Sequence, residues 1–360
     1  MNSEKSPHPP QTSLPESPVF STLATCQPGF ENLLGPELAE AGLIVKETGP
    51  GWVLTEPPSA SAESKTSDLA FPHLLLRQPF EVRGESVNAL AQGLLDFFMS
   101  SLRDERVEGP WPQIWIEARE PIGLNRRAAA VEQAFATLLQ KRFSRVARLA
   151  TASLPRGIGP ARGLFVKFTD FGRAFAARDA FVNGPRRMAD DPQAPSRSYL
   201  KVEEAYGMLG AEPRPGETVA DLGAAPGGWS YSAAKRGAKV LAIDNGPLKG
   251  GAHGHPQIEH SCADAFKFRP AEGVVYDWLF CDLLEEPHFV MREIVEPWLA
   301  NRWCRRFVIN LKFGRVDPLA LQRELREPGS VLTRHASAFR IRHLYHDREE
   351  FTVGGNLDLA

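Results

Sequence analysis

Residues 218–229, TVADLGAAPGGW, place the tightest constraint on how this chain can fold. An apolar run ends in Asp221, a turn of glycine, alanine and proline follows, and a helical pattern begins at Tyr231. This order predicts a strand, a tight loop and a helix, the opening unit of a doubly wound α/β sheet. Ligands of such sheets bind outside the carboxyl ends of the strands, where glycine lets a ligand approach the backbone closely.

The spacing of the glycines limits which nucleotide-like ligand this loop could bind. Gly223, Gly227 and Gly228 fit neither the G-x-G-x-x-G of a dinucleotide site nor a P-loop, because no Lys-Ser/Thr pair follows them. The next predicted strand ends in Asp244, whose carboxylate could accept two ribose hydroxyls, and a third segment carries Asp264, which could meet an adenine amino group. This layout predicts an S-adenosylmethionine (SAM) pocket. The alternative is a sheet whose glycine loop only makes a turn.

The length and composition are those of a multidomain soluble protein. At 360 residues the chain can form two or three domains, and 42% hydrophobic and 24% charged residues are ordinary values. No apolar run approaches the about 18 residues of a membrane span, and the first residues lack the apolar centre of a signal peptide. Four scattered cysteines without a CxxC pair indicate reduced thiols, a cytoplasmic location and no metal site.

The pattern of predicted elements divides the chain into five segments. The first is rich in Ser and Pro, which is typical of a disordered tail, and the linker before the α/β domain contains Pro, Gly and Ser. The predicted boundaries are 1–18 for the tail, 19–105 and 106–182 for two α+β units, 183–198 for the linker and 199–360 for the α/β domain.

Basic charge concentrates in the second α+β unit. Residues 119–187 contain fourteen Lys or Arg and four Asp or Glu, although the whole chain has a net charge of −2. A basic segment with interleaved Arg and Phe fits an RNA-binding module that grips a nucleic-acid backbone by shape and charge. A solvated helix face with a chance excess of charge, and phenylalanines that belong to the core, are the simpler explanations.

Four polar residues at the ends of predicted elements are the catalytic candidates. Lys201 begins the helix before the first strand. Asp282 and Lys312 each end an apolar strand, and Glu350, next to Glu349, leads into the last one. Methyl transfer to a ribose hydroxyl needs a base, and a partly desolvated lysine at a strand end can have its pKa lowered enough to serve. Each residue taken singly could instead form a surface salt bridge.

These features together resemble the FtsJ-like family of SAM-dependent ribose 2′-O-methyltransferases. They resemble more closely the bacterial RlmM family, whose members modify a cytidine ribose in large-subunit ribosomal RNA. The motifs that carry the resemblance follow in the family's order at 194–198, 200–205, 221–224, 226–229, 244–247, 266–270, 281–282, 303–305, 310–312 and 344–350.

The resemblance implies roles for single residues. Lys312 would accept the ribose proton, and Lys201, Asp282 and Glu350 would complete a Lys-Asp-Lys-Glu tetrad. Glu350 is preferred to Glu349 because it directly precedes the last strand. The cofactor would be SAM, and the residues implied to contact it are Ser198, Gly223, Ala225, Pro226, Gly227, Gly228, Trp229, Asp244, Asp264 and Asp282.

The resemblance also implies the architecture and the partners. A Rossmann-like methyltransferase domain would follow a ferredoxin-like unit at 19–105 and a THUMP-type RNA-binding unit at 106–182. The partner would be large-subunit ribosomal RNA, naked or in an early assembly intermediate, with no membrane and no metal, and we expect a monomer. A non-catalytic RNA-binding protein on this fold and a SAM methyltransferase with another acceptor are the competing hypotheses. An Asn/Asp-Pro-Pro-Tyr signature, which many base and amide methyltransferases carry, is missing after Cys281.

Overall fold

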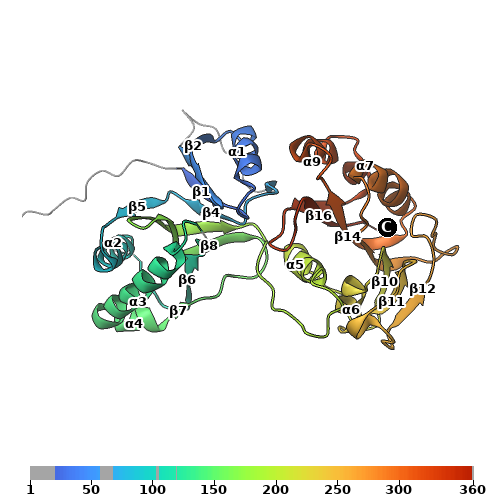
Figure 1. The fold of residues 1–360 in the computed structure, drawn as a ribbon, viewed down its shortest axis with the longest axis horizontal. Coiled ribbons are helices and arrows are strands. Elements are labelled where there is room, and N and C mark those ends of the chain that lie inside the picture. Colours follow the sequence, from blue (N-terminus) through green and yellow to red (C-terminus); the bar gives the residue numbers. More distant parts are fainter. Residues whose placement is uncertain (1–20, 57–67, 103–104, 119, 359–360) are drawn as a thin grey trace, which may run out of the picture.

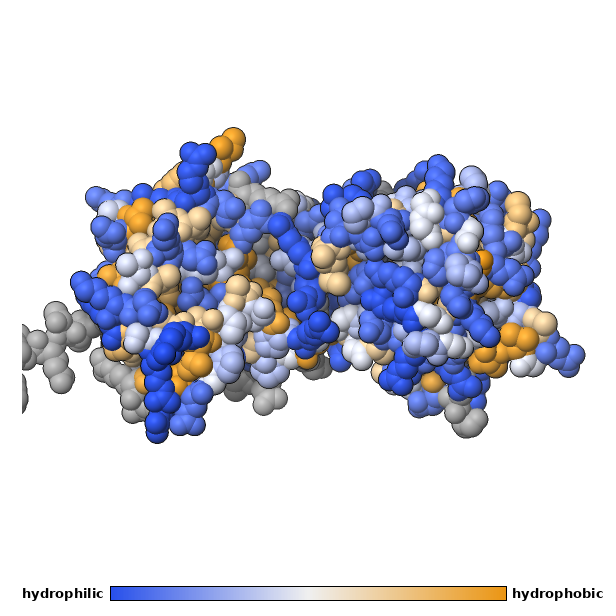
Figure 2. All heavy atoms as spheres, turned by 90° about the horizontal axis from the view of Figure 1, so that it is seen from below, coloured by the Kyte–Doolittle hydropathy of each residue, from blue (hydrophilic) through white to orange (hydrophobic). Residues whose placement is uncertain are grey.

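The computed structural model describes residues 21–56, 68–102, 105–118 and 120–358. Each half of the chain folds around its own sheet (Figure 1). The two halves form two lobes joined by a narrower waist, whose visible surface is largely hydrophilic (Figure 2). The predicted tail, 1–18, lies outside the described residues. Within the described ranges, no helix has the length and apolar content that a bilayer crossing requires.

The N-terminal half is built on one mixed sheet. Its elements are β1 (Thr22–Thr25), α1 (Glu31–Glu40), β2 (Ile44–Gly49), β3 (Trp52–Glu56), β4 (Leu74–Arg77), β5 (Phe80–Arg83), α2 (Val87–Ser100), β6 (Trp111–Ile116), α3 (Leu124–Arg142), α4 (Ser144–Arg148), β7 (Ala150–Thr151), β8 (Gly159–Asp170) and β9 (Arg173–Val182). The strand order is β2-β3-β1-β4-β9-β8-β6-β7, and β5 also pairs with β9. Strands β4 and β5 of the first predicted unit therefore pair with β9 of the second, and the division at 105/106 stays a prediction.

Alternating apolar residues bury both faces of this sheet. In β4, Leu74 and Leu76 pack into one cluster and Leu75 into another, as the two-residue period of a strand requires. Helices α2 and α3 form a layer whose core includes Phe98 and Phe135. Helix α2 begins after Ser86, whose hydroxyl oxygen accepts the Ala89 N–H and so satisfies one open donor of the first turn.

The C-terminal half has the predicted Rossmann-like α/β architecture. Its elements are α5 (Tyr199–Leu209), β10 (Thr218–Leu222), α6 (Gly228–Ala234), β11 (Lys239–Ile243), η2 (Gly250–Ala252), β12 (Ile258–Ser261), β13 (Tyr276–Cys281), α7 (Pro287–Val290), η3 (Met291–Val295), α8 (Glu296–Ala300), β14 (Cys304–Lys312), α9 (Pro318–Arg326), α10 (Val331–His335), β15 (Ala338–Arg342) and β16 (Glu350–Asn356). The sheet order is β12-β11-β10-β13-β14-β16-β15. Strands β10 to β14 are parallel, whereas β16 is antiparallel to both β14 and β15.

Helices cover both faces of this second sheet, which is why its strands are apolar runs rather than alternating ones. Val219 of β10 packs with the helices α5 and α6. Its neighbours Ala220 and Leu222 pack on the other face, in the cluster that also contains Trp298 of α8 and Leu321 of α9. The strand order reverses between β10 and β13, and a ligand crevice is expected at such a switch point.

A buried interface joins the two halves. Phe71 lies between them, with its ring centroid 5.3 Å from that of Phe351 in β16. The carboxylate of Glu37 in α1 accepts the N–H groups of Ala70 at 2.6 Å and of Phe71 at 3.1 Å, and it also accepts the side-chain amide of Gln322 in α9. A buried carboxylate with three donors is satisfied, so this contact fixes how α9 sits against α1.

Two buried histidines at this interface make its stability depend on pH. His73 Nε2 lies 3.2 Å from the carbonyl oxygen of His343, and burial lowers the pKa of His73 to about 3 and that of His343 to about 4. An unfolded histidine has a pKa of about 6.5, so the unfolded chain binds protons that the folded chain does not. The free energy of unfolding should therefore fall as the pH drops below about 6.5.

We expect His73→Gln to flatten this decline, because glutamine keeps a donor and does not titrate. Urea unfolding of the wild type and the variant at several pH values between about 7.5 and 5 measures it. His253→Gln, which alters an exposed histidine, is the matched control and should follow the wild type. Parallel wild-type and His73→Gln curves over this pH range would contradict the prediction.

Candidate active site

The topology brings three of the four predicted catalytic residues to one edge of the sheet. Asp282 directly follows β13, and Lys312 ends β14, which runs parallel to β13. Strand β16 runs the opposite way, so its first residue, Glu350, lies at this same edge and pairs in register with Lys312. Lys201 reaches the site from the first turn of α5.

The four side chains form a closed ring of alternating charge. Lys312 Nζ donates to Asp282 Oδ1 at 2.5 Å and to Glu350 Oε2. Lys201 Nζ lies 2.5 Å from Glu350 Oε1 and 3.6 Å from Asp282 Oδ2. Glu350 is 4% exposed, whereas its neighbour Glu349 is exposed and does not join the ring.

The ring is ionised as it stands. Burial by itself would lower the pKa of Lys312, but Asp282 and Glu350 outweigh it, and the pKa is raised. Burial would likewise raise the pKa values of Asp282 and Glu350, yet the two lysines outweigh it and both values are lowered. The expectation that desolvation lowers the pKa of Lys312 is therefore wrong for this arrangement, because two carboxylates stabilise the ammonium.

A chain of buried polar residues lies behind the ring. Asn310 Nδ2 donates to Asp282 Oδ1 at 3.1 Å, and Thr352 Oγ1 lies 3.2 Å from Asn310 Oδ1 and 3.1 Å from Asp347 Oδ2. Burial and then the charge of Glu350 raise the pKa of Asp347 to about 8. The Thr352 hydroxyl is placed to donate to the Asp347 carboxylate or to the Asn310 side-chain oxygen. With its oxygen toward Thr352, Asn310 presents its amide nitrogen to Asp282.

The sequence analysis did not assign Asn310, Thr352 or Asp347 to the site. Asn310 carried a signal, since it is the single amide within the apolar run FVINL of β14. Thr352 carried none, because threonine is common in strands. Asp347 lies in a loop motif that was noted only for its resemblance.

The predicted cofactor residues of the glycine loop and Asp244 lie at the carboxyl ends of β10 and β11, and Gly223 lies next to Asp282. Asp244 follows β11, and its carboxylate accepts the N–H of Ala225 at 3.0 Å and that of Gly246 at 2.6 Å. The indole N–H of Trp229 donates to the carbonyl oxygen of Ser198 at 2.9 Å, which ties the loop to the start of α5. Pro226 follows a cis peptide bond, and Gly223 and Gly227 have φ values of 78° and 105°, which favour glycine.

Two further carboxylates support the crevice. Asp221, at the end region of β10, is fully buried and accepts the Ser230 hydroxyl at 2.6 Å, and burial raises its pKa to about 7. Asp221 ends the first apolar run of the α/β domain, but no role was predicted for it from the sequence. Asp264 lies in the loop after β12, where its carboxylate accepts the Phe266 N–H at 2.9 Å and its side chain remains 41% exposed. An exposed carboxylate there is accessible to a ligand.

Comparisons with known proteins agree with this geometry. The model of the FtsJ-like methyltransferase family matches residues 194–305, which carry the glycine loop and Asp282. The chain is 32% identical over 353 residues to the ribosomal RNA large subunit methyltransferase M of Laribacter hongkongensis, with 92% of this chain and 95% of the relative covered. It belongs to the ribosomal RNA large subunit methyltransferase M family. The family member of Marinomonas sp. is 30% identical, with 92% and 98% covered, and that of Halorhodospira halophila is 42% identical over 200 residues, with 54% and 57% covered.

A methyltransferase of this family uses SAM, and the crevice residues fit it. A Cβ built on Gly228 would lie 2.9 Å from Ser198 Oγ and 3.1 Å from the Tyr199 nitrogen, so glycine is what lets the loop pack this closely against the start of α5. A Cβ on Gly223 would lie 3.7 Å from the Asp282 carbonyl oxygen, which shows how closely the loop approaches the catalytic ring. The open loop backbone and the carboxylate of Asp244 are groups that a nucleoside cofactor can contact.

We expect Gly228→Ala to weaken SAM binding at least about tenfold, because the added methyl group would clash with Ser198 and displace the loop. Isothermal titration calorimetry with SAM measures the change. Gly207→Ala is the matched control, since Gly207 also lies in a helix and its Cβ would meet open space. Equal SAM affinity for the two variants would refute the prediction.

Proposed function

We propose that this protein transfers a methyl group from SAM to the ribose 2′-hydroxyl of a cytidine in large-subunit ribosomal RNA. The observation that carries the proposal is the partly buried ring of Lys201, Asp282, Lys312 and Glu350 beside the glycine loop. A ribose hydroxyl needs a positioned base, and the ring supplies one next to the crevice. The family members named above are ribosomal RNA methyltransferases, which supports RNA as the acceptor.

The proposed reaction is an in-line displacement, for which positioning supplies much of the rate. Bound SAM would supply an electrophilic methyl group, and its sulfur would keep the electron pair of the broken sulfur–carbon bond, leaving S-adenosylhomocysteine. Lys312, once it has lost its own proton to solvent, would accept the proton of the 2′-hydroxyl as the oxygen–carbon bond forms, and Asp282 and Glu350 would hold the resulting ammonium. Because these two carboxylates raise the pKa of Lys312, a hydroxyl that replaced one of the two contacts would lower it.

The N-terminal half is proposed to hold the RNA. Its segment 106–182 would act as a THUMP-type unit, and the exposed Lys141, Arg142, Arg145 and Arg148, at the end of α3 and in α4, support contacts to phosphates. The ferredoxin-like segment, 19–105, would connect this unit to the methyltransferase domain. We further propose that the protein acts as a monomer in the cytoplasm, on naked ribosomal RNA or an early assembly intermediate.

We expect Lys312→Ala to lower the rate of methyl transfer by about 10²–10⁴-fold, because the proton acceptor is removed. Transfer from labelled SAM to protein-free ribosomal RNA, followed by nuclease mapping, measures the rate and locates the label. Lys239→Ala, which removes an exposed lysine at the start of β11, the end of that strand opposite to the site, is the matched control and should behave as the wild type. Label on a nucleobase would refute ribose methylation. SAM binding without transfer would favour another acceptor or a non-catalytic RNA-binding protein.

We expect Asn310→Ala to lower kcat about tenfold with little change in SAM affinity, because Asp282 loses the donor that orients it. The same assay gives kcat, and calorimetry gives the Kd for SAM. Asn301→Ala, which alters an exposed asparagine outside the ring, is the control. Equal losses of stability and of SAM affinity would mean that Asn310 has only a structural role.

A further inference from the structure

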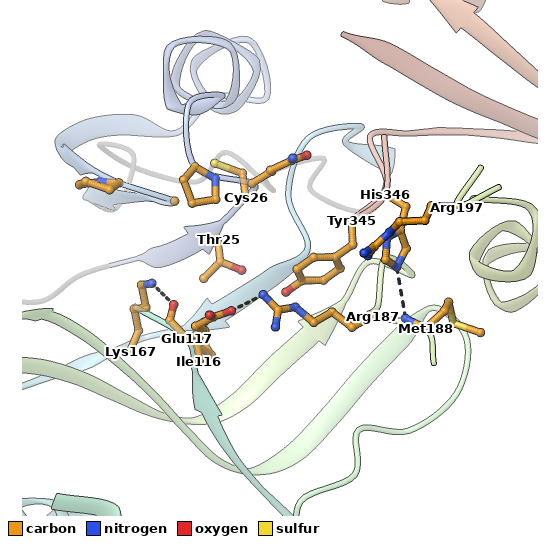
Figure 3. Close-up of a pocket in the computed structure, with 14 residues that line it drawn as sticks. Thr25, Cys26, Ile116, Glu117, Lys167, Arg187, Met188, Arg197, Tyr345 and His346 are labelled. Carbon is orange, nitrogen blue, oxygen red and sulfur yellow. Dashed lines mark hydrogen bonds and ion pairs between the residues drawn. The ribbon is translucent and has the colours of Figure 1, made fainter. Parts of the chain in front are cut away.

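A pocket of about 370 Å³ lies where the two halves meet (Figure 3). The N-terminal sheet contributes Glu117 and Lys167, the linker contributes Arg187 and Arg197, and the loop before β16 contributes Tyr345 and His346. None of its lining residues belongs to the catalytic ring or to the predicted cofactor site. Its volume falls within the roughly 300–1,000 Å³ of small-ligand sites.

The charge of this pocket favours an anion. Lys167 is 3% exposed and its Nζ donates to the carbonyl oxygen of Glu117 at 2.7 Å, while burial lowers its pKa to about 8. Arg187 pairs with the Glu117 carboxylate, and Arg197 is exposed. The pocket lining therefore contains three basic side chains and a single carboxylate, that of Glu117.

The surroundings of His346 show the same excess of positive charge. Its Nε2 accepts the Met188 N–H at 3.3 Å, which requires a neutral ring on that nitrogen. Its pKa is lowered by burial and then by Arg197 and Arg187. A phosphate between the two arginines would relieve this repulsion.

The pocket also presents an aromatic face. The ring of Tyr345 points toward the space between Arg187 and the N-terminal sheet in Figure 3, and the Arg187 guanidinium lies 6.0 Å from its centroid. The centroid of the Tyr345 ring also lies 4.1 Å from that of the buried His73. This contact with the N-terminal half fixes the orientation of Tyr345. Proteins that bind single-stranded RNA stack unpaired bases on such rings and hold the backbone with arginine.

Hydrogen bonds to Glu204 of α5 hold the segments that line the pocket. Glu204 follows Lys201 by one turn of α5, and its carboxylate accepts the N–H groups of Tyr345 at 2.9 Å and of His346 at 3.3 Å. It also accepts the Arg186 N–H of the linker at 2.6 Å. The helix that carries Lys201 thus holds both the aromatic and the basic wall of the pocket in place.

We propose that this pocket binds a second, unmethylated nucleotide of the RNA substrate, with its unpaired base on Tyr345 and its phosphate at Arg187 and Arg197. The inference rests on the proposed function, because it takes the substrate to be RNA. It adds that the enzyme recognises an unpaired nucleotide at a fixed place beside the target. A site for a simple anion would not need the aromatic side chain of Tyr345, and a fully paired duplex could not supply an unpaired base.

The test measures RNA binding separately from methyl transfer. The probe is a fluorescent, protein-free fragment of large-subunit ribosomal RNA that contains a single-stranded loop, with a fully paired duplex of equal length beside it. We expect Tyr345→Leu to raise the Kd for the loop RNA about tenfold, and Tyr345→Phe, which keeps the ring, to stay within about twofold. The duplex should bind the wild type and Tyr345→Leu equally. Unchanged loop binding by Tyr345→Leu would overturn the proposal.

Arg197→Ala gives an independent measurement, because this exposed arginine can be removed without opening the core. We expect weaker loop binding and a salt dependence reduced by about one phosphate contact. Arg292→Ala, which removes an exposed arginine outside the pocket, should leave loop binding unchanged. Calorimetry should give the same SAM affinity for all variants. This equality is the control that each variant has folded. Equal loop affinities for Arg197→Ala and Arg292→Ala would also overturn the proposal.

Failure of this inference and failure of the proposed function give different results. If the wild type methylates ribosomal RNA but the Tyr345 and Arg197 variants bind the loop normally, the pocket proposal is wrong and the reaction stands. If the variants lose loop binding but no ribose is methylated, the pocket stands and the proposed reaction is wrong.

Discussion

The antiparallel pairing of β14 with β16 is the constraint on which the active site depends. It sets Lys312, which is partly exposed, opposite the buried Glu350, so that each charge stabilises the other. Asp282 and Lys201 complete the ring from β13 and α5, so that two positive and two negative charges balance. This balance explains why four ionised side chains are tolerated in a largely buried site.

The same strand also positions α5. A Cβ on Gly354 of β16 would lie 2.9 Å from the methyl carbon of Met208 and 3.1 Å from Leu209, so glycine is what lets the helix pack this closely. Because α5 carries both Lys201 and Glu204, this packing places one lysine in the ring and orders the loop of the interdomain pocket. The catalytic ring and the pocket are therefore held by one helix.

The two halves of the molecule are joined in a way that suits a substrate spanning both. Glu37 and Phe71 fix the N-terminal sheet against α9 and β16, and His73 extends this contact to Tyr345. This junction connects the half that contains the basic segment 119–187 to the half that contains Lys312. An RNA held by the first half would then present its ribose to the second without a large rearrangement.

The sequence by itself determined the domain type and the residues of the ring. A first apolar strand with a glycine loop after it, and later apolar strands that lead to Asp244, Asp282 and Lys312, are local patterns that a strand period and a turn dictate. Strand β15, the insertion of β16 between β14 and β15, and the continuity of the N-terminal sheet depend on pairing between distant segments, which local patterns do not encode. The direction of the pKa shift of Lys312 and the pocket between Lys167 and Tyr345 were likewise decided only by the tertiary structure, because both arise from charges and surfaces brought together by folding.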